Sequence, residues 1–205
     1  MTGGLRRFLT PIQRTAPGER CEMCSEPIGP EHGHVIDLES RVIMCTCRGC
    51  YLLFTHTGAG GKRHRAVPQR FLHAPRFGLG AALWESAGIP VKMAFLFRNS
   101  MQDRTVAFYP SPAGATESLL PLGAWDEMLA NTTAFADIAE DVEALLLNKL
   151  DLGFECFLVP IDVCYELVGI VRSRWRGFDG GTEAHEAMDD FFAKLRERSE
   201  VVTDG

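Results

Sequence analysis

The sequence contains no apolar run long enough to cross a membrane, because a spanning helix needs about 18 or more consecutive apolar residues. It also begins without the apolar stretch of a secretory signal peptide. Both absences predict a cytoplasmic protein, and thiols stay reduced in that compartment. The seven cysteines of the chain are therefore expected to serve a purpose other than disulfide formation.

A large excess of positive charge is missing as well. The formal net charge is −6, with a surplus of +4 in residues 1–75 and of −10 in residues 76–205. Nucleic-acid-binding domains are usually strongly basic, and an acidic surface repels the phosphate backbone. Nucleic-acid binding is therefore disfavoured, and a nucleic-acid-binding zinc ribbon is kept only as an alternative function.

Motifs that name a reaction are absent too. The chain has no dinucleotide-binding fingerprint, no paired carboxylates and no Ser-His-Asp arrangement. Hydrophobic residues nevertheless make up 46% of the chain, which is ample for a packed core. We therefore expect a folded protein without an assigned catalytic residue, and we favour a binding role over an enzymatic one.

Cysteines are concentrated near the N-terminus. Cys21-x-x-Cys24 and Cys47-x-x-Cys50 form two pairs separated by 22 residues, a length that suits a two-stranded hairpin. Such a hairpin would bring the pairs together as the tetrahedral four-sulfur shell that zinc accepts. About 35 residues cannot bury enough surface to fold alone, so metal binding would supply much of the folding free energy. The pattern predicts a metal site at these four cysteines, with zinc favoured over rubredoxin-type iron or an iron–sulfur cluster.

A fifth cysteine leaves the ligand set open. Cys45 and Cys47 lie two residues apart, so they share one side of an extended strand. Cys45 could therefore be an alternate ligand in place of one of the four, or it could join an iron–sulfur cluster. In the second case the chain would be a small redox protein, which is an alternative functional hypothesis.

Two histidines stand between the cysteine pairs. The His32-x-His34 pattern bears a faint resemblance to HNH nucleases, in which a histidine activates water. Such a site also needs an asparagine that orients the base, and none lies between His34 and Cys47. The favoured interpretation is two strand histidines beside a zinc site.

The turn residues and apolar positions predict a fold of the α+β class. We expect a small N-terminal zinc-ribbon-like lobe, followed by an α+β domain with a small antiparallel sheet and several helices. The expected divisions are a flexible arm at 1–19, the metal lobe at 20–57, a linker at 58–65 and the α+β domain at 66–205.

Individual elements follow from periodicity and turn signals. The predicted strands are 34–39, 41–45, 91–97, 104–109 and 154–159. The predicted helices are 79–87, 125–130, 135–148, 160–172 and 183–198. The last of them is expected to be capped by Thr182 and to bury an apolar stripe of Ala184, Met188, Phe191, Phe192 and Leu195. The small-residue segment 111–118 is expected to form a helix-capping turn rather than an anion-binding loop.

One basic cluster interrupts the acidic half of the chain. It consists of Arg172, Arg174, Trp175 and Arg176. Such a cluster could hold a carboxylate, a phosphate or an acidic partner surface, with the indole ring as a stacking anchor. Alternatively, the arginines neutralise nearby acidic side chains, for which the candidates are Asp162, Glu166 and Glu183. The cluster is the candidate partner- or anion-binding site.

Five segments carry a family resemblance. They are RCEMCSEPI (20–28), CTCRGCYLLF (45–54), VAFYPSPAGATESLL (106–120), FLVPIDVCYELVG (157–169) and RWRGFDGGTE (174–183). Together they resemble an actinobacterial family of hydrogenase-cluster-associated proteins with an N-terminal zinc-ribbon-like cysteine motif. Members of that family are often encoded beside nickel–iron hydrogenase structural and maturation genes.

The resemblance covers about residues 19–198 and implies an accessory role in a hydrogenase system, in maturation, assembly or as a subunit. The implied partners are hydrogenase subunits or maturation factors. The resemblance supplies no catalytic residues.

Overall fold

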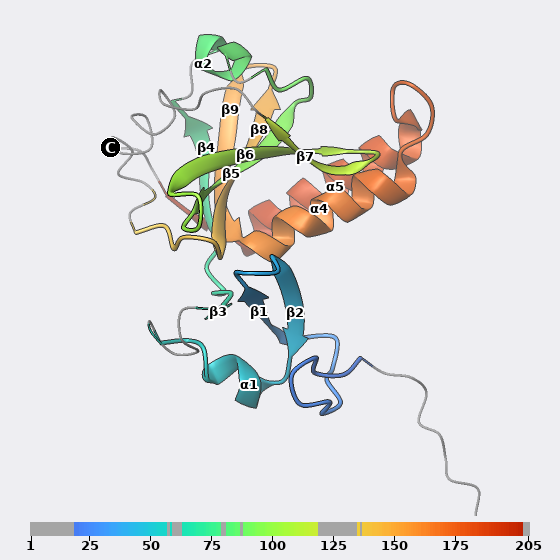
Figure 1. Ribbon diagram of the computed structural model, residues 1–205. Helices are drawn as coiled ribbons and strands as arrows, with labels where there is room; N and C mark the ends of the chain where they lie inside the picture. Colours follow the sequence, from blue (N-terminus) through green and yellow to red (C-terminus); the bar gives the residue numbers. More distant parts are fainter. Residues whose placement is uncertain are drawn as a thin grey trace, which may run out of the picture.

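The computed structural model describes residues 19–56, 58, 63–78, 81–86, 88–118, 135 and 137–202. The fold is of the predicted α+β class. A small N-terminal lobe with a three-stranded sheet lies beside a larger unit that is built on a seven-stranded sheet (Figure 1). No helix among these residues is both long and apolar enough to cross a membrane.

The N-terminal lobe contains β1 (Gly33–Asp37), β2 (Val42–Thr46), the short helix α1 (Arg48–Leu52) and β3 (His64–Ala66). The strands are antiparallel in the order β2-β1-β3. The turn between β1 and β2 forms where expected, because the Asp37 carboxylate accepts hydrogen bonds from the backbone N–H groups of Glu39 and Ser40. The end of the predicted linker, His64 and Arg65, lies in β3.

The large sheet is more extensive than the small sheet expected from the sequence. Its order is β10-β4-β9-β8-β5-β6-β7, and only the pair β10/β4 is parallel. The strands are β4 (Leu72–Phe77), β5 (Met93–Asn99), β6 (Arg104–Ser111), β7 (Gly114–Ser118), β8 (Glu143–Leu150), β9 (Gly153–Pro160) and β10 (Glu200–Val201). The predicted strands at 91–97, 104–109 and 154–159 are confirmed as β5, β6 and β9.

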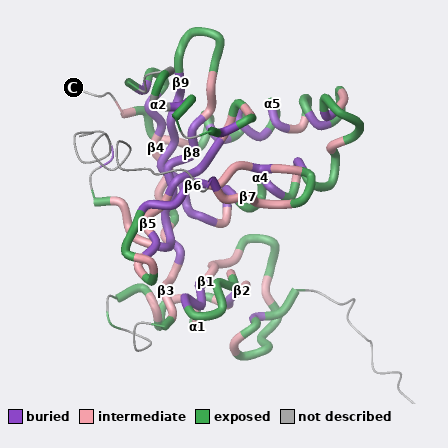
Figure 2. The backbone as a smooth tube through the Cα atoms, turned by 45° about the horizontal axis from the view of Figure 1, so that its top comes forward, coloured by how far each residue is buried: buried purple, intermediate pink, exposed green. Residues whose placement is uncertain are grey.

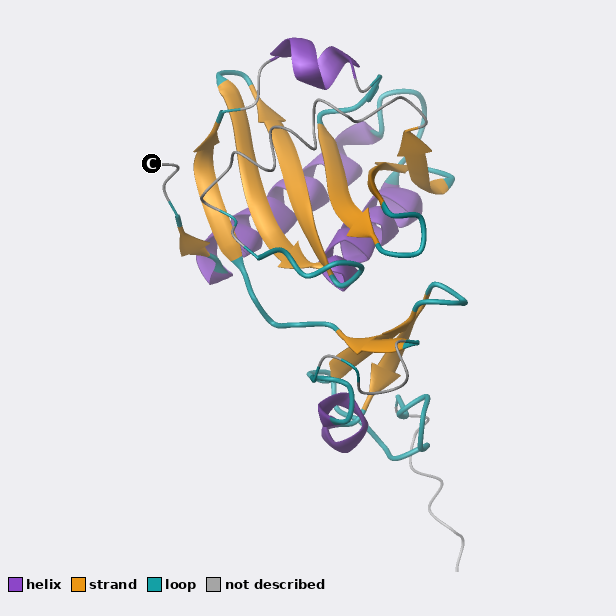
Figure 3. Ribbon diagram, turned by 60° about the vertical axis from the view of Figure 1, so that its left-hand side comes forward, coloured by secondary structure: helices purple, strands orange, loops and turns teal. Residues whose placement is uncertain are grey.

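Two long helices cover one face of this sheet (Figure 3). The helix α4 (Ile161–Arg174) confirms the predicted helix at 160–172, although Pro160 is its N-cap and not its first residue. The helix α5 (Gly181–Arg198) buries the expected apolar stripe, which consists of Ala184, Met188, Phe191, Phe192 and Leu195. The predicted cap at Thr182 is wrong, since the N-cap of α5 is Gly180 with φ 93°, and the Gly181 N–H donates to Asp179 Oδ1 at 3.3 Å. Within the predicted helix at 79–87, the structure describes α2 (Ala81–Ser86); residues 79, 80 and 87 lie outside the described residues.

The predicted helix at 135–148 is wrong, because residues Glu143–Leu150 form the central strand β8. A strand buried on both faces reads as a continuous apolar run, and such a run also matches helical spacing. Leu145 and Leu146 illustrate the point, since they lie next to each other in sequence but in two different apolar cores. The pairing of β8 with β5 and β9 decided the outcome.

The segment 111–118 also differs from the prediction. It does not cap a helix but forms β7 and the turn that leads to it from β6. Gly114 has φ 122°, a backbone conformation that favours glycine. The predicted helix at 125–130 lies outside the described residues.

The large sheet separates two apolar cores, and the chain that runs through its middle is buried (Figure 2). One core lies between the sheet and α4 with α5; the other includes Trp84 of α2. The N-terminal lobe contributes Ile36, Leu38 and Val67 to the first core. The lobe therefore does not stand apart, because its apolar side chains pack with those of the larger unit.

Candidate metal centre

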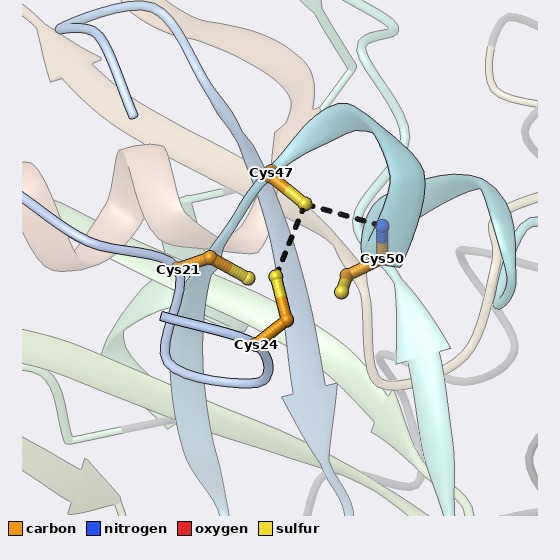
Figure 4. A group of neighbouring side chains, drawn as sticks. All are labelled: Cys21, Cys24, Cys47 and Cys50. Atoms are coloured by element: carbon orange, nitrogen blue, oxygen red, sulfur yellow. Dashed lines mark hydrogen bonds between the residues drawn. The ribbon is translucent and has the colours of Figure 1, made fainter. Parts of the chain in front are cut away.

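The four cysteines of the two C-x-x-C pairs converge on one point of the N-terminal lobe (Figure 4). Cys21 and Cys24 lie on a tight turn, in which the Ser25 N–H donates to the Cys21 carbonyl oxygen at 2.8 Å. Cys47 is the N-cap of α1, and Cys50 lies within that helix. The hairpin β1–β2 places the turn of Cys21 and Cys24 beside the start of α1, so the two cysteine pairs meet as their spacing in the sequence predicts.

The distances between the sulfur atoms test whether a metal fits. The four Sγ atoms lie within 4.8 Å of one another, and those of Cys24 and Cys47 are 3.6 Å apart. A disulfide would need about 2.05 Å. A tetrahedron with Zn–S bonds of about 2.3 Å has edges of about 3.8 Å. The sulfur set therefore has the size of a four-thiolate metal shell and could hold zinc or iron.

Hydrogen bonds to sulfur support the same interpretation. The N–H of Cys50 donates to Cys47 Sγ at 3.5 Å. Desolvation works to raise the pKa of Cys21, but hydrogen bonds from the backbone of Cys47, Cys24 and Met23 outweigh it and lower the pKa to about 6. Desolvation and the neighbouring thiols raise the pKa of Cys50 to about 12. Without a cation, the four thiols therefore do not all ionise near neutral pH. A bound metal ion would stabilise all four as thiolates.

The lobe has few buried contacts of its own apart from those with the larger unit. Most of its chain is exposed or half-buried, in contrast to the sheet of the larger unit (Figure 2). Its local packing includes Tyr51, whose hydroxyl donates to the Val67 carbonyl oxygen at 3.0 Å. The same ring leaves no room for a side chain at Gly33, where a Cβ would lie 2.5 Å from it. A small sheet with so few buried side chains is the kind of unit that metal binding stabilises.

Cys45 is not part of the four-sulfur group. It pairs across the hairpin with His34, and its sulfur belongs to a second group with His32 and His34. Burial and the charges of three carboxylates raise the pKa of its thiol. The sequence interpretation treated the two histidines as neighbours of a zinc site and did not combine them with Cys45. The signal that could have found the group is a His-x-His strand facing a cysteine of the next strand.

The basic cluster lies at the C-terminal end of α4. Arg172, Arg174 and Arg176 are exposed, and no ion pair links them to an acidic side chain within the part of the chain that the structure describes. Trp175 is half-buried, packs against the first core and donates from Nε1 to the Gly177 carbonyl oxygen at 3.2 Å. Only part of its indole ring is therefore exposed for contact with a partner.

The sequence reasoning missed an apolar residue beside these arginines. Phe178 lies in the loop between α4 and α5 and is fully exposed. Arginine and large aromatic side chains are the residues that dominate interface hot spots. Its position three residues after Trp175 was visible in the sequence, but its exposure was not.

Comparison with family models shows which family the chain belongs to. Residues 20–199 match DUF5947, described as a family of unknown function, and the chain is a member of it. Neither the curated proteins nor the solved structures compared with the chain yield a match. The match covers the cysteine lobe and both long helices.

Proposed function

We propose that this member of the DUF5947 family is a zinc-binding accessory protein that acts by binding a protein partner. The single observation that carries the proposal is the convergence of the sulfurs of Cys21, Cys24, Cys47 and Cys50. Four thiolates fill a tetrahedral shell and leave no open position, which is the mark of a structural rather than a catalytic zinc site. The metal would then hold the lobe in its folded form.

The second candidate function is electron transfer by iron. It has one specific observation in its favour, because a four-cysteine shell with N–H groups directed at sulfur also suits rubredoxin-type iron. Metal analysis and a visible spectrum of anaerobically purified protein separate the two. Zinc gives a colourless protein, and an iron-coloured protein would overturn the assignment of zinc.

The ligand assignment has its own test. Cys21→Ser removes a thiolate of the proposed shell and should release one equivalent of metal per chain. Cys156→Ser is the matched control, because Cys156 is fully buried in the second apolar core and far in sequence from the lobe. Retention of the full metal content by the Cys21→Ser protein would refute the assignment.

The partner surface that we propose is the tip at the C-terminal end of α4. It consists of the exposed Arg172, Arg174 and Arg176, the half-buried Trp175 and the exposed Phe178. The loop projects away from the sheet, where a partner can reach it (Figure 1). Arginine and aromatic side chains dominate interface hot spots, because one offers a fork of donors and the other a large apolar face. The complementary partner surface would be acidic with an apolar pocket.

For the partner we propose a subunit or maturation factor of a nickel–iron hydrogenase, on the basis of the resemblance of the five sequence segments. Tagged protein from its native host should co-purify with such proteins and not with nucleic acid. The double variant Arg174→Ala, Phe178→Ala should weaken the association by about 2 kcal/mol or more. Leu152→Ala is the control, since Leu152 is equally exposed but lies in the β8–β9 turn. Unchanged association of the double variant would remove this surface from the proposal.

A further inference from the structure

A second group of metal-ligating side chains lies beside the four cysteines. One ring nitrogen each of His32 and His34 and the sulfur of Cys45 lie within 4.8 Å of one another. His34 and Cys45 face each other across the β1/β2 ladder, and His32 precedes β1 by one residue. Residues two apart in an extended segment share a side, so the hairpin register alone brings the three together.

His32 has an unused nitrogen in a place where such atoms are rare. Its side chain is 10% exposed, and its Nδ1 lies 2.8 Å from the Gly29 carbonyl oxygen. A carbonyl only accepts, so Nδ1 carries the proton and Nε2 presents a lone pair. Nε2 is buried and has no hydrogen-bond partner in the structure. Buried polar atoms are almost always paired, and a lone pair fixed in this way is what a metal requires.

His34 also has its Nδ1 atom held by an oxygen acceptor. Its Nδ1 lies 2.5 Å from Asp162 Oδ2, a carboxylate oxygen in the first turn of α4. The carboxylate holds the proton on Nδ1 and leaves Nε2 as the free nitrogen. A carboxylate–histidine pair of this kind orients the ring and raises its basicity at protein metal sites. The contact spans 128 residues of sequence, so it exists only because the lobe and α4 meet.

The charge around the group favours a cation. Glu22 accepts a hydrogen bond from the Cys45 N–H at 2.6 Å, and Glu19 Oε2 lies 3.7 Å from His32 Nδ1. Together with Asp162, these carboxylates place three acidic groups beside the two imidazoles and the thiol. No lysine or arginine is recorded in an ion pair with these carboxylates within the part of the chain that the structure describes. A doubly charged ion would balance them.

We propose that His32, His34 and Cys45 bind a second divalent transition-metal ion of the zinc class, with Asp162 as the positioning residue behind His34. Two imidazoles and one thiolate are ligands of intermediate softness, which zinc accepts and magnesium or calcium does not. Three protein ligands leave the fourth tetrahedral position free for water or another ligand. The site would thus differ in kind from the closed four-cysteine shell.

Two of the three proposed ligands lie at the wall of a cavity. His32, His34 and Asp162 line a cavity of about 1220 Å³ between the lobe and the larger unit. Tyr51, from the lobe, and Arg198, at the end of α5, lie on its wall as well. A metal with an open position at the wall of a cavity is the arrangement by which zinc proteins admit a small ligand. The four-cysteine shell supplies no such position.

The test uses the full-length protein, with zinc content and a cobalt replacement as readouts. We expect two zinc ions per chain in the wild type and one in the His34→Gln and Cys45→Ser proteins. With Co²⁺ as the probe, both variants should keep the intense bands of a four-thiolate site, which also proves that the lobe is folded. They should lose a second set of bands at higher energy that belongs to a site with fewer sulfurs. His56→Gln is the control, because His56 is an exposed histidine of the same lobe.

Asp162→Asn tests the positioning role. It should weaken the second Co²⁺ or Zn²⁺ by about 10- to 100-fold in competition with a chelating dye, without changing the first. A merely structural role would leave the affinity unchanged once the protein is folded. One metal per chain in the wild type, or loss of the four-thiolate bands in the Cys45→Ser protein, would overturn the proposal.

Discussion

Removal of the metal from the four-cysteine site should destabilise the whole chain and not the N-terminal lobe alone. The reason is the shared core. Ile36, Leu38 and Val67 belong to the lobe, are buried, and pack in one cluster with residues of the large sheet and of α4. Arg65 of β3 also donates to the Glu140 carbonyl oxygen at 3.0 Å. When the lobe unfolds, these contacts are lost and the apolar face beneath them is exposed to water.

The structure sets the size of the effect. Complete burial of one such aliphatic side chain contributes about 1.5–3 kcal/mol, so the three together contribute at most about 5–9 kcal/mol. This is comparable with the whole unfolding free energy of an ordinary domain, about 5–15 kcal/mol. Even half of the upper figure, about 4.5 kcal/mol, would lower the melting temperature of a chain of this size by about 9–18 °C.

Circular dichroism is the assay, because most of the helical signal comes from α4 and α5 in the larger unit. The melting temperature of that signal should fall when a chelator removes the metal from the full-length protein. The Cys21→Ser protein should already melt at a lower temperature and should respond less to the chelator than the wild type does. A helical signal that melts at the same temperature with and without metal would refute the coupling and show two independent units.

Three further changes test other parts of the fold. Arg70→Met should lower the free energy of unfolding by about 3 kcal/mol, because it leaves the buried Glu143 carboxylate without its two guanidinium hydrogen bonds of 2.9 and 2.7 Å. Chemical denaturation measures this loss, and an unchanged midpoint would contradict the prediction. Glu155→Gln tests pH dependence. Desolvation works to raise the pKa of Glu155, but hydrogen bonds from an arginine, an asparagine and a histidine lower it overall. Its ionised form therefore stabilises the protein above about pH 4, and this contribution is lost as the pH falls further. The variant should be less stable by about 1.5 kcal/mol or more at pH 7, with a difference from wild type that shrinks in acid. Gly180→Ala should lower the free energy of unfolding by about 2 kcal/mol, because the backbone has φ 93° and the added Cβ would lie 3.0 Å from an indole ring. Gly177→Ala should lower it by only about 1 kcal/mol, because the backbone has φ 67° but the added Cβ meets no other atom within 4 Å. Equal losses in the two glycine variants would exclude the ring contact as a cause.

The elements that the sequence predicted correctly are those whose signal is local. The hairpin 34–45, the helix after Pro160 and the apolar stripe of α5 follow from turn residues and side-chain periodicity. The four-sulfur group followed from spacing alone, since a hairpin of that length returns the second pair to the first. None of these required knowledge of which strands pair at long range.

The elements that were predicted wrongly are those whose structure depends on pairing between strands that are far apart in the sequence. In β8, the run from Glu143 to Leu150 fits a helix or a strand buried on both faces, and only β5 and β9 on either side distinguish the two. The strand β4 was missed because Pro75 interrupts it, and the register of β4 with β9 does shift between Ala74 and Phe77. The group of His32, His34 and Cys45 is different, because the local hairpin brings these three residues together; only Asp162, which lies 128 residues from His34, could not be placed beside them from the sequence.

The helix α4 connects the two regions to which we assign functions. Its first turn carries Asp162, which holds His34, and its last turn carries Arg172 and Arg174 of the proposed partner surface. Fourteen helical residues extend for about 21 Å, so a partner whose contacts are confined to the tip would leave the cavity beside His32 uncovered. Binding of a partner and access of a small ligand to the second metal site are therefore compatible in this fold. The single helix α4 would hold the partner surface and the second metal site at a fixed separation. A bound partner could therefore deliver a ligand to the cavity, or receive one from it, only if it extended along α4 toward the N-terminal lobe.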